Sequence, residues 1–284
     1  MRPLREYASL AYNVSRPRFW FYVAGPFTVG CIWGAQRATA LLTPEFFAYL
    51  FYFLLPANVF LYGVNDYWDH DTDRFNPKKG DKEYRVDPSE RSTLREVLIA
   101  MTVTSLALMV FQSWGQRLVF GAFLFLSYFY SAKPLRFKAT LFFDSSSNFL
   151  YALPGVFGYL TFTGEFPPTI IMLAALLHST AMHLFSAIPD IEWDKSVNLI
   201  TTAVKIGERG STIICLSLWT VFSVTVMVVG GFSPLSLLPI IYPSLVAWVI
   251  IRGLEVSDVY WFYPYINTGL GGLLFLLGYL RIPF

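Results

Sequence analysis

Nine long apolar segments run through the sequence, and they constrain the fold more than any other feature. Each approaches the length of about 20 apolar residues that a transmembrane helix needs. Their approximate ranges are 19–36, 44–64, 93–113, 117–132, 141–162, 167–188, 211–230, 233–251 and 261–280. Backbone polar groups in lipid must be bonded within the chain, so segments of this kind form helices. We therefore predict an all-α polytopic membrane protein with nine transmembrane helices.

The composition agrees with a membrane protein and indicates a single domain over 1–284. The chain is 55% hydrophobic and 14% charged, whereas a soluble domain carries about 25% charged residues. No low-complexity tract or long linker divides it. Residues 1–18 are not followed by a short apolar region with a cleavage site, so we expect the first span to be retained. Cys31 and Cys215 lie inside apolar segments, which indicates neither a disulfide framework nor a cysteine metal site.

The basic residues predict how the chain is oriented. If the N-terminus is cytoplasmic, 18 of the 21 Lys and Arg residues lie on the cytoplasmic side, and only Arg37, Arg117 and Arg281 lie outside. This asymmetry favours a cytoplasmic N-terminus and a C-terminus on the opposite side. The basic inner face either fixes this topology or binds anionic lipid headgroups.

Two acidic clusters follow long apolar segments about half a chain apart. The first runs from Asn65 to Asp73 and reads NDYWDHDTD, and the second runs from Asp190 to Asp194 and reads DIEWD. On a helix, Asp66, Asp69 and Asp73 fall at positions i, i+3 and i+7, and Asp190 and Asp194 fall at i and i+4. Each cluster is therefore expected to project its carboxylates from one helix face.

Carboxylates that crowd together need a cation, and their hard oxygens suit Mg²⁺. Mg²⁺ typically takes one or two carboxylates, keeps several waters and binds substrate phosphates. Two such clusters on the predicted cytoplasmic face indicate a diphosphate held between them. The charged segment 74–85, which follows the first cluster, is either a solvated loop or a lid whose cations meet the diphosphate.

Three further polar features have two interpretations each. Tyr130 and Lys133 are three residues apart near a helix end set by Pro134, and they either grip a phosphate or form an interfacial belt with a snorkelling lysine. Asp144 is either a site residue or a helix cap. His178 and His183 are interpreted as packed polar residues, with proton acceptance as the alternative.

The two acidic clusters resemble those of a known family. Asn65-Asp66-x-x-Asp69-x-x-x-Asp73 is similar to the first motif of the UbiA superfamily of intramembrane prenyltransferases, and Asp190-x-Glu192-x-Asp194 is similar to the second. The resemblance extends from about Asn13 to Gly210. Within the superfamily, three stretches most resemble the lycopene elongase branch, namely 15–20, 76–79 and 130–138 with Asp144-Ser145.

This resemblance implies a fold and a set of roles. It implies nine helices ringed around a central cavity, with a polar cap and an active site that face the cytoplasm. By position, two Mg²⁺ ions would be held by Asn65, Asp66, Asp69, Asp73, Asp190 and Asp194. Tyr130 and Lys133 would bind diphosphate, and Asn13 and Arg85 would line the same pocket. Lys133 would also stabilise the charge that develops on the leaving diphosphate.

The resemblance also implies a reaction: Mg²⁺-dependent transfer of an isoprenyl group from an allylic diphosphate, dimethylallyl diphosphate above all, to a lipophilic acceptor. Lycopene or a related carotenoid is the expected acceptor. Quinone-precursor enzymes of the superfamily place Arg near the position of Asn13, and its absence here favours an uncharged acceptor. The expected partners are the isoprenyl diphosphate, the acceptor, membrane lipid and other membrane proteins of carotenoid synthesis, but no nucleic acid.

Other functions remain open from the sequence alone. A quinone precursor, chlorophyllide or a glycerol-based lipid is an alternative acceptor. Intramembrane acids also mark transporters and channels, although the acids here cluster at one membrane face. A protein that binds isoprenoid diphosphates without turnover is a third possibility.

Overall fold

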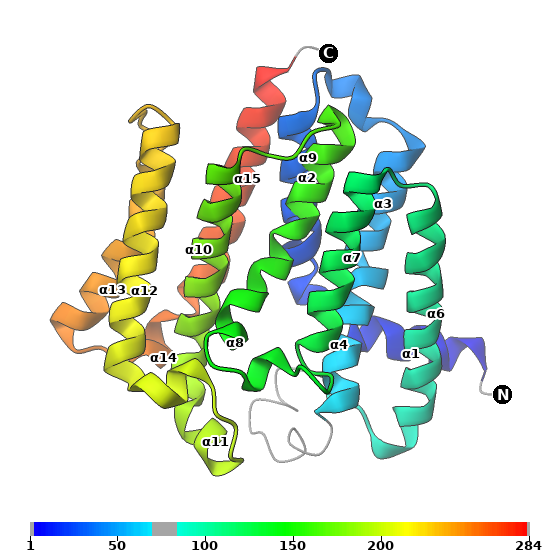
Figure 1. The fold of residues 1–284 in the computed structure, drawn as a ribbon, viewed down its shortest axis with the longest axis horizontal. Helices are drawn as coiled ribbons and strands as arrows, with labels where there is room; N and C mark the ends of the chain where they lie inside the picture. The colour runs from blue at the N-terminus through cyan, green and yellow to red at the C-terminus, as the bar shows by residue number, and fades with distance from the viewer. Residues whose placement is uncertain (1–2, 70–83, 283–284) are drawn as a thin grey trace. The chain divides into compact units, whose positions relative to one another are not determined.

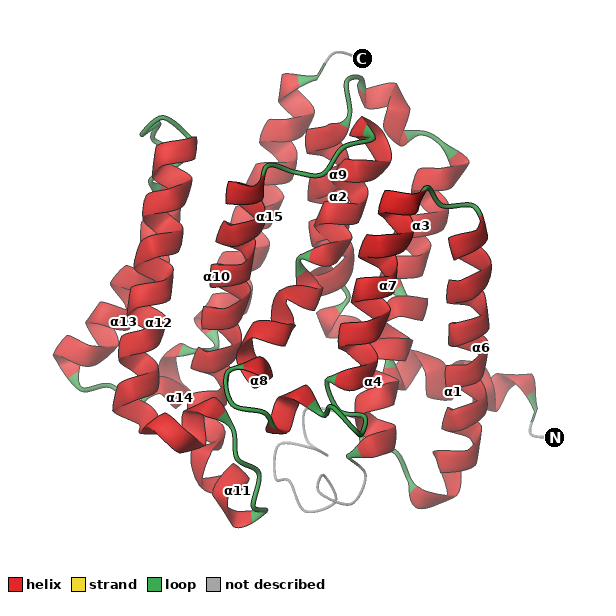
Figure 2. Cartoon of the chain, in the orientation of Figure 1, coloured by secondary structure: helices red, strands yellow, loops and turns green. Residues whose placement is uncertain are grey.

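The computed structural model describes residues 3–69 and 84–282, and these residues form helices and connecting turns. The described part of the chain contains no β-strand (Figure 2). This confirms the predicted all-α fold class. The chain divides into two compact units. Unit 1 comprises Met1–Arg136, Leu153–Phe166 and Leu274–Phe284, and unit 2 comprises Phe137–Ala152 and Pro167–Leu273.

Unit 1 holds the N-terminal half of the chain and the α-helix that follows the first segment of unit 2. Its described elements are α1 (Leu4–Val14), η1 (Pro17–Phe19), α2 (Phe21–Gly34), η2 (Ala38–Leu41), α3 (Pro44–Leu54), α4 (Pro56–Trp68), η3 (Pro88–Glu90), α6 (Arg91–Val110), α7 (Trp114–Phe129) and α9 (Leu153–Thr163). The end of α15 (Phe262–Arg281) completes it, and the indole N–H of Trp33 donates to the backbone carbonyl of Leu274 at 3.1 Å.

Helices α2 and α9 pack closely because both carry glycines at their contact. A Cβ atom placed on Gly30 would lie 2.0 Å from the backbone oxygen of Gly155, and one on Gly158 would lie 2.5 Å from that of Phe27. Any larger side chain would force the two backbones apart. Small residues of this kind are the usual means of close helix approach in a membrane, where lipid gives helices little hydrophobic reason to associate.

An aromatic cluster fills the interior of unit 1. Phe27, Phe53, Phe120 and Phe157 are all buried, and the centroids of neighbouring rings among them lie between 5.1 and 6.4 Å apart. Tyr52 joins them and shares a 2.7 Å hydrogen bond with Ser105. The cluster holds α2, α3, α7 and α9 together, and so it fixes the frame from which α4 carries the first acidic motif.

Helix α1 lies across α4 and α6 (Figure 1). Its buried residues Leu10 and Val14 pack with Val86 and Leu94. At the end of α1 the backbone N–H of Ser15 bonds to Ala11 at 3.0 Å. Arg16 directly follows Ser15. Because α1 packs on α4, Arg16 is held beside α4.

Unit 2 is built around α10 and α12. Its elements are η4 (Phe137–Ala139), α8 (Phe143–Ser146), η5 (Ser147–Tyr151), α10 (Thr169–Ala187), η6 (Ile188–Asp190), α11 (Ile191–Ser196), α12 (Thr202–Val229), η7 (Leu238–Ile240), α13 (Ile241–Arg252), α14 (Val256–Val259) and the first part of α15. Helix α12 is kinked at Gly207, whose φ of 79° is readily accessible only to glycine.

Stacked aromatic rings form the core of unit 2. The rings of Trp219 and Tyr263 lie 4.8 Å apart at 12° between their planes, and the ring of Tyr242 lies 5.6 Å from Trp219 and 5.9 Å from Tyr263. The phenol of Tyr242 donates to the side-chain oxygen of Asn267 at 2.6 Å. This hydrogen bond pairs two polar side chains within the bundle, as a lipid environment favours.

Four helical stretches in the described ranges are long and apolar enough to cross a membrane: Pro44–Trp68, Pro88–Val110, Thr169–Ser196 and Thr202–Val229. They coincide with four of the nine predicted segments. The other five segments also contain helix, but it is shorter, less apolar or interrupted. The count of nine membrane spans and the ring around a central cavity remain predictions.

The predicted segment 141–162 is divided in the structure. It contains the short helix α8, the 3₁₀ turns of η5 and then α9. The polar run from Asp144 to Asn148 accounts for this, because its side chains bond to backbone groups and compete with a regular helix ladder.

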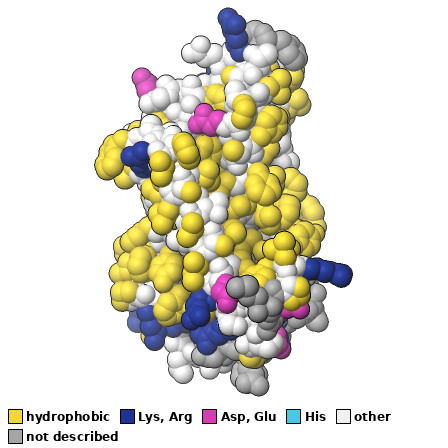
Figure 3. Space-filling view, turned by 90° about the vertical axis from the view of Figure 1, so that its right-hand side faces the viewer, with side chains coloured by type: hydrophobic (Ala, Val, Ile, Leu, Met, Phe, Trp, Pro, Cys, Tyr) yellow, Lys and Arg dark blue, Asp and Glu magenta, His cyan; other side chains and the backbone are white. Residues whose placement is uncertain are grey.

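Hydrophobic side chains cover much of the face drawn in Figure 3, and Lys and Arg gather mainly toward its lower end. Helix α6 exposes an apolar row of this type through Ile99, Val103, Leu106 and Val110. An exposed apolar surface flanked by basic residues is expected where a helix bundle faces lipid.

Candidate active site

The first acidic motif lies at the C-terminal end of α4. Asn65 and Asp66 are in its last turn, and Asp69 caps the helix, with its backbone N–H bonded to the carbonyl of Asn65 at 2.9 Å. Asp66 is 5% exposed and Asp69 is 1% exposed. The side-chain amide of Asn65 donates to Asp69 Oδ2 at 3.0 Å. Asp66 and Asp69, which were predicted to share a helix face, are thus both buried at the end of α4, whereas Asp73 lies outside the described residues.

Two arginines from other segments contact these aspartates. Arg16 Nη2 lies 2.8 Å from Asp66 Oδ1, and the Arg16 guanidinium also covers the ring of Tyr62 at 4.7 Å. Arg136 Nη2 lies 3.5 Å from Asp69 Oδ1. Both ion pairs belong to unit 1 and join residues far apart in sequence, so the motif is a mixed site of acids and guanidinium groups.

The segment after α7 reaches the same motif through Ser131. The amide of Asn65 donates to Ser131 Oγ at 2.8 Å. Helix α7 ends at Phe129, which is earlier than Pro134 predicted, and Tyr130 caps it. Tyr130 is half-buried and Lys133 is exposed. Their proposed contact with diphosphate stays a prediction, but Ser131 places their segment beside Asn65.

The second acidic motif is in unit 2, around the junction of η6 and α11. Asp190 ends η6 and is half-buried, and Asp194 is buried within α11. Thr201 donates its hydroxyl to Asp194 Oδ2 at 3.4 Å. Glu192 is exposed and pairs with Lys195 at 2.7 Å. The helix therefore separates Glu192 from Asp194, and the meeting of this motif with the first in one site remains a prediction.

Asp144 has a structural role. Its carboxylate accepts hydrogen bonds from the backbone N–H and the hydroxyl of Thr202, and from the backbone N–H of Ser145. Since Thr202 begins α12, the carboxylate holds α8 against the start of α12. This favours a capping role over the catalytic interpretation. The sequence predicted a cap on the start of the segment that contains Asp144, whereas the helix that it caps is α12.

The two histidines of α10 have different surroundings. His178 Nδ1 accepts a hydrogen bond from the indole N–H of Trp219 at 3.2 Å, and its ring packs on Tyr242. His183 lies within electrostatic reach of Asp144 and Asp190. The contacts of His178 agree with the prediction that it is a packed polar residue. His183 lies near Asp190 of the second acidic motif.

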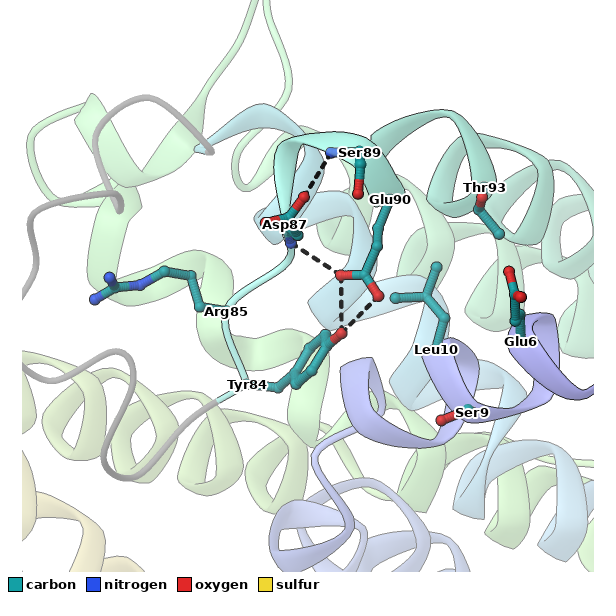
Figure 4. Close-up of a pocket in the computed structure, with 9 residues that line it drawn as sticks. All are labelled: Glu6, Ser9, Leu10, Tyr84, Arg85, Asp87, Ser89, Glu90 and Thr93. Atoms are coloured by element: carbon teal, nitrogen blue, oxygen red, sulfur yellow. Dashed lines mark hydrogen bonds between the residues drawn. The ribbon is translucent and has the colours of Figure 1, made fainter. Parts of the chain in front are cut away.

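Arg85 lines a pocket of about 400 Å³ between α1 and the start of α6 (Figure 4). Glu6, Asp87 and Glu90 make this pocket acidic, and its lining includes no residue of either acidic motif. The phenol of Tyr84 donates to both carboxylate oxygens of Glu90 at 2.8 Å. Burial raises the pKa of Tyr84, and the neighbouring carboxylates of Glu90 and Asp87 raise it further.

Asn13 lies closer to the first motif. It is half-buried in the last turn of α1, and its backbone carbonyl accepts a hydrogen bond from the backbone N–H of Arg16 at 3.2 Å. Asn13 thus belongs to the turn that presents Arg16 to Asp66.

The donor atoms of the first motif suit a hard cation. Asp66 and Asp69 supply two buried carboxylates on one helix end, which is the number of carboxylates that Mg²⁺ takes when waters and phosphate complete its shell, and Asn65 adds an amide oxygen. Within residues 3–69 and 84–282, no cluster of three or more His, Cys, Asp or Glu side chains could hold a metal by itself. Two carboxylates leave coordination positions of Mg²⁺ for waters and for the oxygens of a diphosphate.

Sequence reasoning missed Arg16, Arg136 and Ser131. All three lie in stretches that carry the family resemblance, and this resemblance is the sequence feature that could have identified them as site residues. Their pairing with α4 was not predictable, because the contacts join residues 50, 67 and 66 positions apart.

Comparison with known proteins identifies the family, since the UbiA prenyltransferase family matches residues 23–267. The chain belongs to the UbiA prenyltransferase family. It is 42% identical to the lycopene elongase/hydratase of Haloferax volcanii over 266 residues, which are 93% of this chain and 86% of that protein. It is 40% identical to the lycopene elongase/hydratase of Haloarcula japonica over 271 residues, which are 91% and 87% of the two chains.

A solved structure shares the fold of this UbiA protein. The structure of a UbiA homologue from Archaeoglobus fulgidus bound to DMAPP and Mg²⁺ superposes with a TM-score of 0.72 at 22% identity, covering 96% of this chain and 98% of the other. The fold is thus the UbiA membrane fold. The chain is an integral membrane protein and a prenyltransferase.

Proposed function

We propose that this UbiA prenyltransferase transfers the isoprenyl group of dimethylallyl diphosphate to lycopene or a related carotenoid. The observation that carries the proposal is the end of α4, where buried Asp66 and Asp69 lie with Asn65 on one helix end. The two haloarchaeal relatives support the choice of acceptor, because both are named for the elongation of lycopene and align over most of their length. The DMAPP and Mg²⁺ bound to the Archaeoglobus homologue support the donor and the metal.

The reaction begins with cleavage of the allylic C–O bond, which leaves the electron pair on diphosphate and an allylic cation. In our proposal, Tyr130 and Lys133 bind the diphosphate, with Asn13 and Arg85 as further contacts. Lys133 is exposed at the end of α7 and can approach a ligand without breaking a buried contact. Its ammonium group stabilises the negative charge that develops on the leaving group.

In our proposal, two Mg²⁺ ions would be held by the amide and carboxylate side chains of the two motifs, namely Asn65, Asp66, Asp69, Asp73, Asp190 and Asp194. Bound Mg²⁺ would supply Lewis-acid neutralisation of the diphosphate charge. The amide of Asn65 orients Asp69 through the 3.0 Å hydrogen bond, and Thr201 does the same for Asp194. Partners of this kind fix the direction of a ligating carboxylate.

The allylic cation then adds to a terminal alkene of the acceptor and leaves a tertiary carbocation. That cation loses a proton to give an alkene, or takes up water and loses a proton to give an alcohol. The name elongase/hydratase of the two relatives supports the second route. An uncharged acceptor needs no counter-ion, which agrees with Asn at position 13.

The membrane arrangement is part of the proposal. We place residues 1–284 in one domain of nine transmembrane helices around a cavity, with a cytoplasmic N-terminus and active site and a C-terminus on the opposite side. The distribution of the 21 basic residues supports it. Membrane lipid and other proteins of carotenoid synthesis are the proposed neighbours.

Expression in a lycopene-accumulating host tests the function. We expect lycopene to be converted to C45 and C50 products, and we expect Asp69→Asn to leave it unchanged while the protein still inserts in the membrane. Product masses would reveal whether water is retained. The acceptor assignment is wrong if lycopene persists while a hydroxybenzoate, naphthoate or chlorophyllide gains a prenyl tail in the same membranes.

A further inference from the structure

Each described aspartate of the first motif is paired with an arginine. Asp66 meets Arg16 at 2.8 Å and Asp69 meets Arg136 at 3.5 Å. The Arg16 side chain is 10% exposed and that of Arg136 is 30% exposed. The two arginines come from separate loops, one after α1 and one after α7. Each aspartate therefore pairs with a guanidinium group from a different segment.

The backbone at both arginines is unusual. Arg16 has a φ of 50° and Arg136 a φ of 40°, a left-handed conformation that residues other than Gly, Asn and Asp seldom adopt. Such conformations persist when surrounding contacts determine them, and they concentrate at functional sites. In both loops an ion pair with an aspartate brings the side chain to α4, and Arg16 also covers the ring of Tyr62 on that helix.

The charges of the two pairs balance, and this conflicts with metal binding. A Mg²⁺ ion placed beside Asp66 and Asp69 would meet two guanidinium groups, and like charges in a poorly hydrated site repel strongly. A diphosphate has the opposite effect, because guanidinium groups bind phosphate oxygens in a bidentate manner. The arrangement therefore favours entry of the metal together with the diphosphate over entry of the metal alone.

We propose that Arg16 and Arg136 are exchangeable counter-ions: they hold Asp66 and Asp69 while no metal is bound, and they transfer to the diphosphate when Mg²⁺ takes the carboxylates. The proposal rests on the proposed function, because it assumes that the first motif receives Mg²⁺ and a diphosphate. It makes the two arginines positioning residues that couple the binding of metal to the binding of substrate.

Two consequences distinguish this role from a purely structural ion pair. Removal of a guanidinium group strengthens binding of a divalent metal in the absence of diphosphate, because a competitor of the metal is lost. The same change weakens binding of diphosphate in the presence of metal, because a phosphate ligand is lost. A structural ion pair predicts no gain in metal affinity.

The experiment measures Mn²⁺ binding to the detergent-purified protein by the electron paramagnetic resonance signal of the free ion. Arg16→Gln and Arg136→Gln are compared with the wild type, first with Mn²⁺ alone and then with Mn²⁺ and inorganic pyrophosphate. We expect each variant to bind Mn²⁺ alone about tenfold more tightly and pyrophosphate about tenfold more weakly, which lies within the usual range of coupling between sites. The Arg136 side chain is more exposed than that of Arg16, so Arg136→Gln should disturb folding less. The proposal can therefore be tested with Arg136→Gln if Arg16→Gln does not fold.

Two controls complete the design. Arg95→Gln removes the same charge from an exposed position on α6 and is expected to change neither affinity. Asp66→Asn is expected to abolish the Mn²⁺ binding that Arg16→Gln strengthens, which locates the metal at this motif. Mn²⁺ affinities in both arginine variants that equal or fall below the wild-type value would overturn the proposal, as would unchanged pyrophosphate affinities.

The outcome is separable from that of the proposed function. Metal and pyrophosphate binding are measured without donor or acceptor, so they do not depend on whether lycopene is the substrate. Failure to convert lycopene together with tighter Mn²⁺ binding in the arginine variants would overturn the acceptor assignment and support the exchange.

Discussion

The carboxylate of Asp144 accepts two hydrogen bonds from Thr202, one from its backbone N–H at 2.7 Å and one from its hydroxyl at 2.5 Å. The residues lie 58 positions apart, and both are buried in unit 2. A carboxylate that meets the first backbone N–H of a helix also interacts favourably with the helix dipole. This contact explains why an ionisable group is tolerated in an otherwise apolar segment.

The first prediction follows from this pair. Asp144→Ala leaves the first N–H of α12 without its partner, and we expect a loss of about 1–3 kcal/mol in the free energy of unfolding. Thr202→Val keeps the backbone hydrogen bond and should lose less. Thermal unfolding in detergent measures both. An Asp144→Ala protein with unchanged stability but no activity would assign Asp144 to catalysis instead.

The second prediction concerns the acids of the two motifs. Asp66→Asn, Asp69→Asn and Asp190→Asn should each reduce turnover by about 100-fold or more. Each removes a negative carboxylate that would hold Mg²⁺, and Mg²⁺ neutralises the charge of the diphosphate. Removal of divalent metal with EDTA should have the same effect, and added Mg²⁺ should reverse it. Initial rates of product formation in membranes provide the measurement.

Glu192→Gln is the matched control for these variants. It removes a carboxylate from the second motif, but Glu192 is exposed and pairs with Lys195 on the side of α11 away from Asp194. We expect a rate close to that of the wild type. Equal losses in Glu192→Gln and Asp190→Asn would contradict the assignment of metal ligands in this motif.

The sequence predicts the parts of this protein that depend on local pattern. Hydrophobic length predicted the four long apolar helices, and helical spacing predicted that Asp66 and Asp69 lie together, as they do at the end of α4. The break within 141–162 was not predicted, because the hydropathy of that segment outweighed the polar run that begins at Asp144. The structure shows that this polar run has specific backbone partners.

Pairing between distant residues is the part that local pattern does not contain. Arg16 precedes Pro17 and Arg136 lies two residues after Pro134. Nothing in their spacing predicts contact with Asp66 or Asp69. The contacts arise because α1 lies across α4 and because the loop after α7 returns to the end of α4. Both depend on tertiary packing.

The third prediction tests the packing of α2 against α9. Gly30→Ala places a methyl group where the backbone oxygen of Gly155 lies only 2.0 Å away, so the helices must separate. We expect a clear drop in the unfolding temperature, and a larger one for Gly30→Leu, since overpacking of an interior costs about 1–3 kcal/mol. Gly25→Ala on the same helix meets no atom within 4 Å and is the matched control. Equal stability of Gly30→Ala and Gly25→Ala would show that the helices approach less closely.

The last prediction concerns topology. The 18-to-3 division of basic residues places the segment that carries Lys195 in the cytoplasm and the loop that carries Glu165 on the opposite side. Both residues are exposed, so a cysteine at either position can react with a membrane-impermeant thiol reagent. The native Cys31 and Cys215 are fully buried and should contribute little background labelling. In sealed cells, reagent added outside should label Glu165→Cys but not Lys195→Cys, and inverted membrane vesicles should give the reverse. Labelling of both positions from the same side would refute the predicted topology, because an odd number of spans could not then separate them.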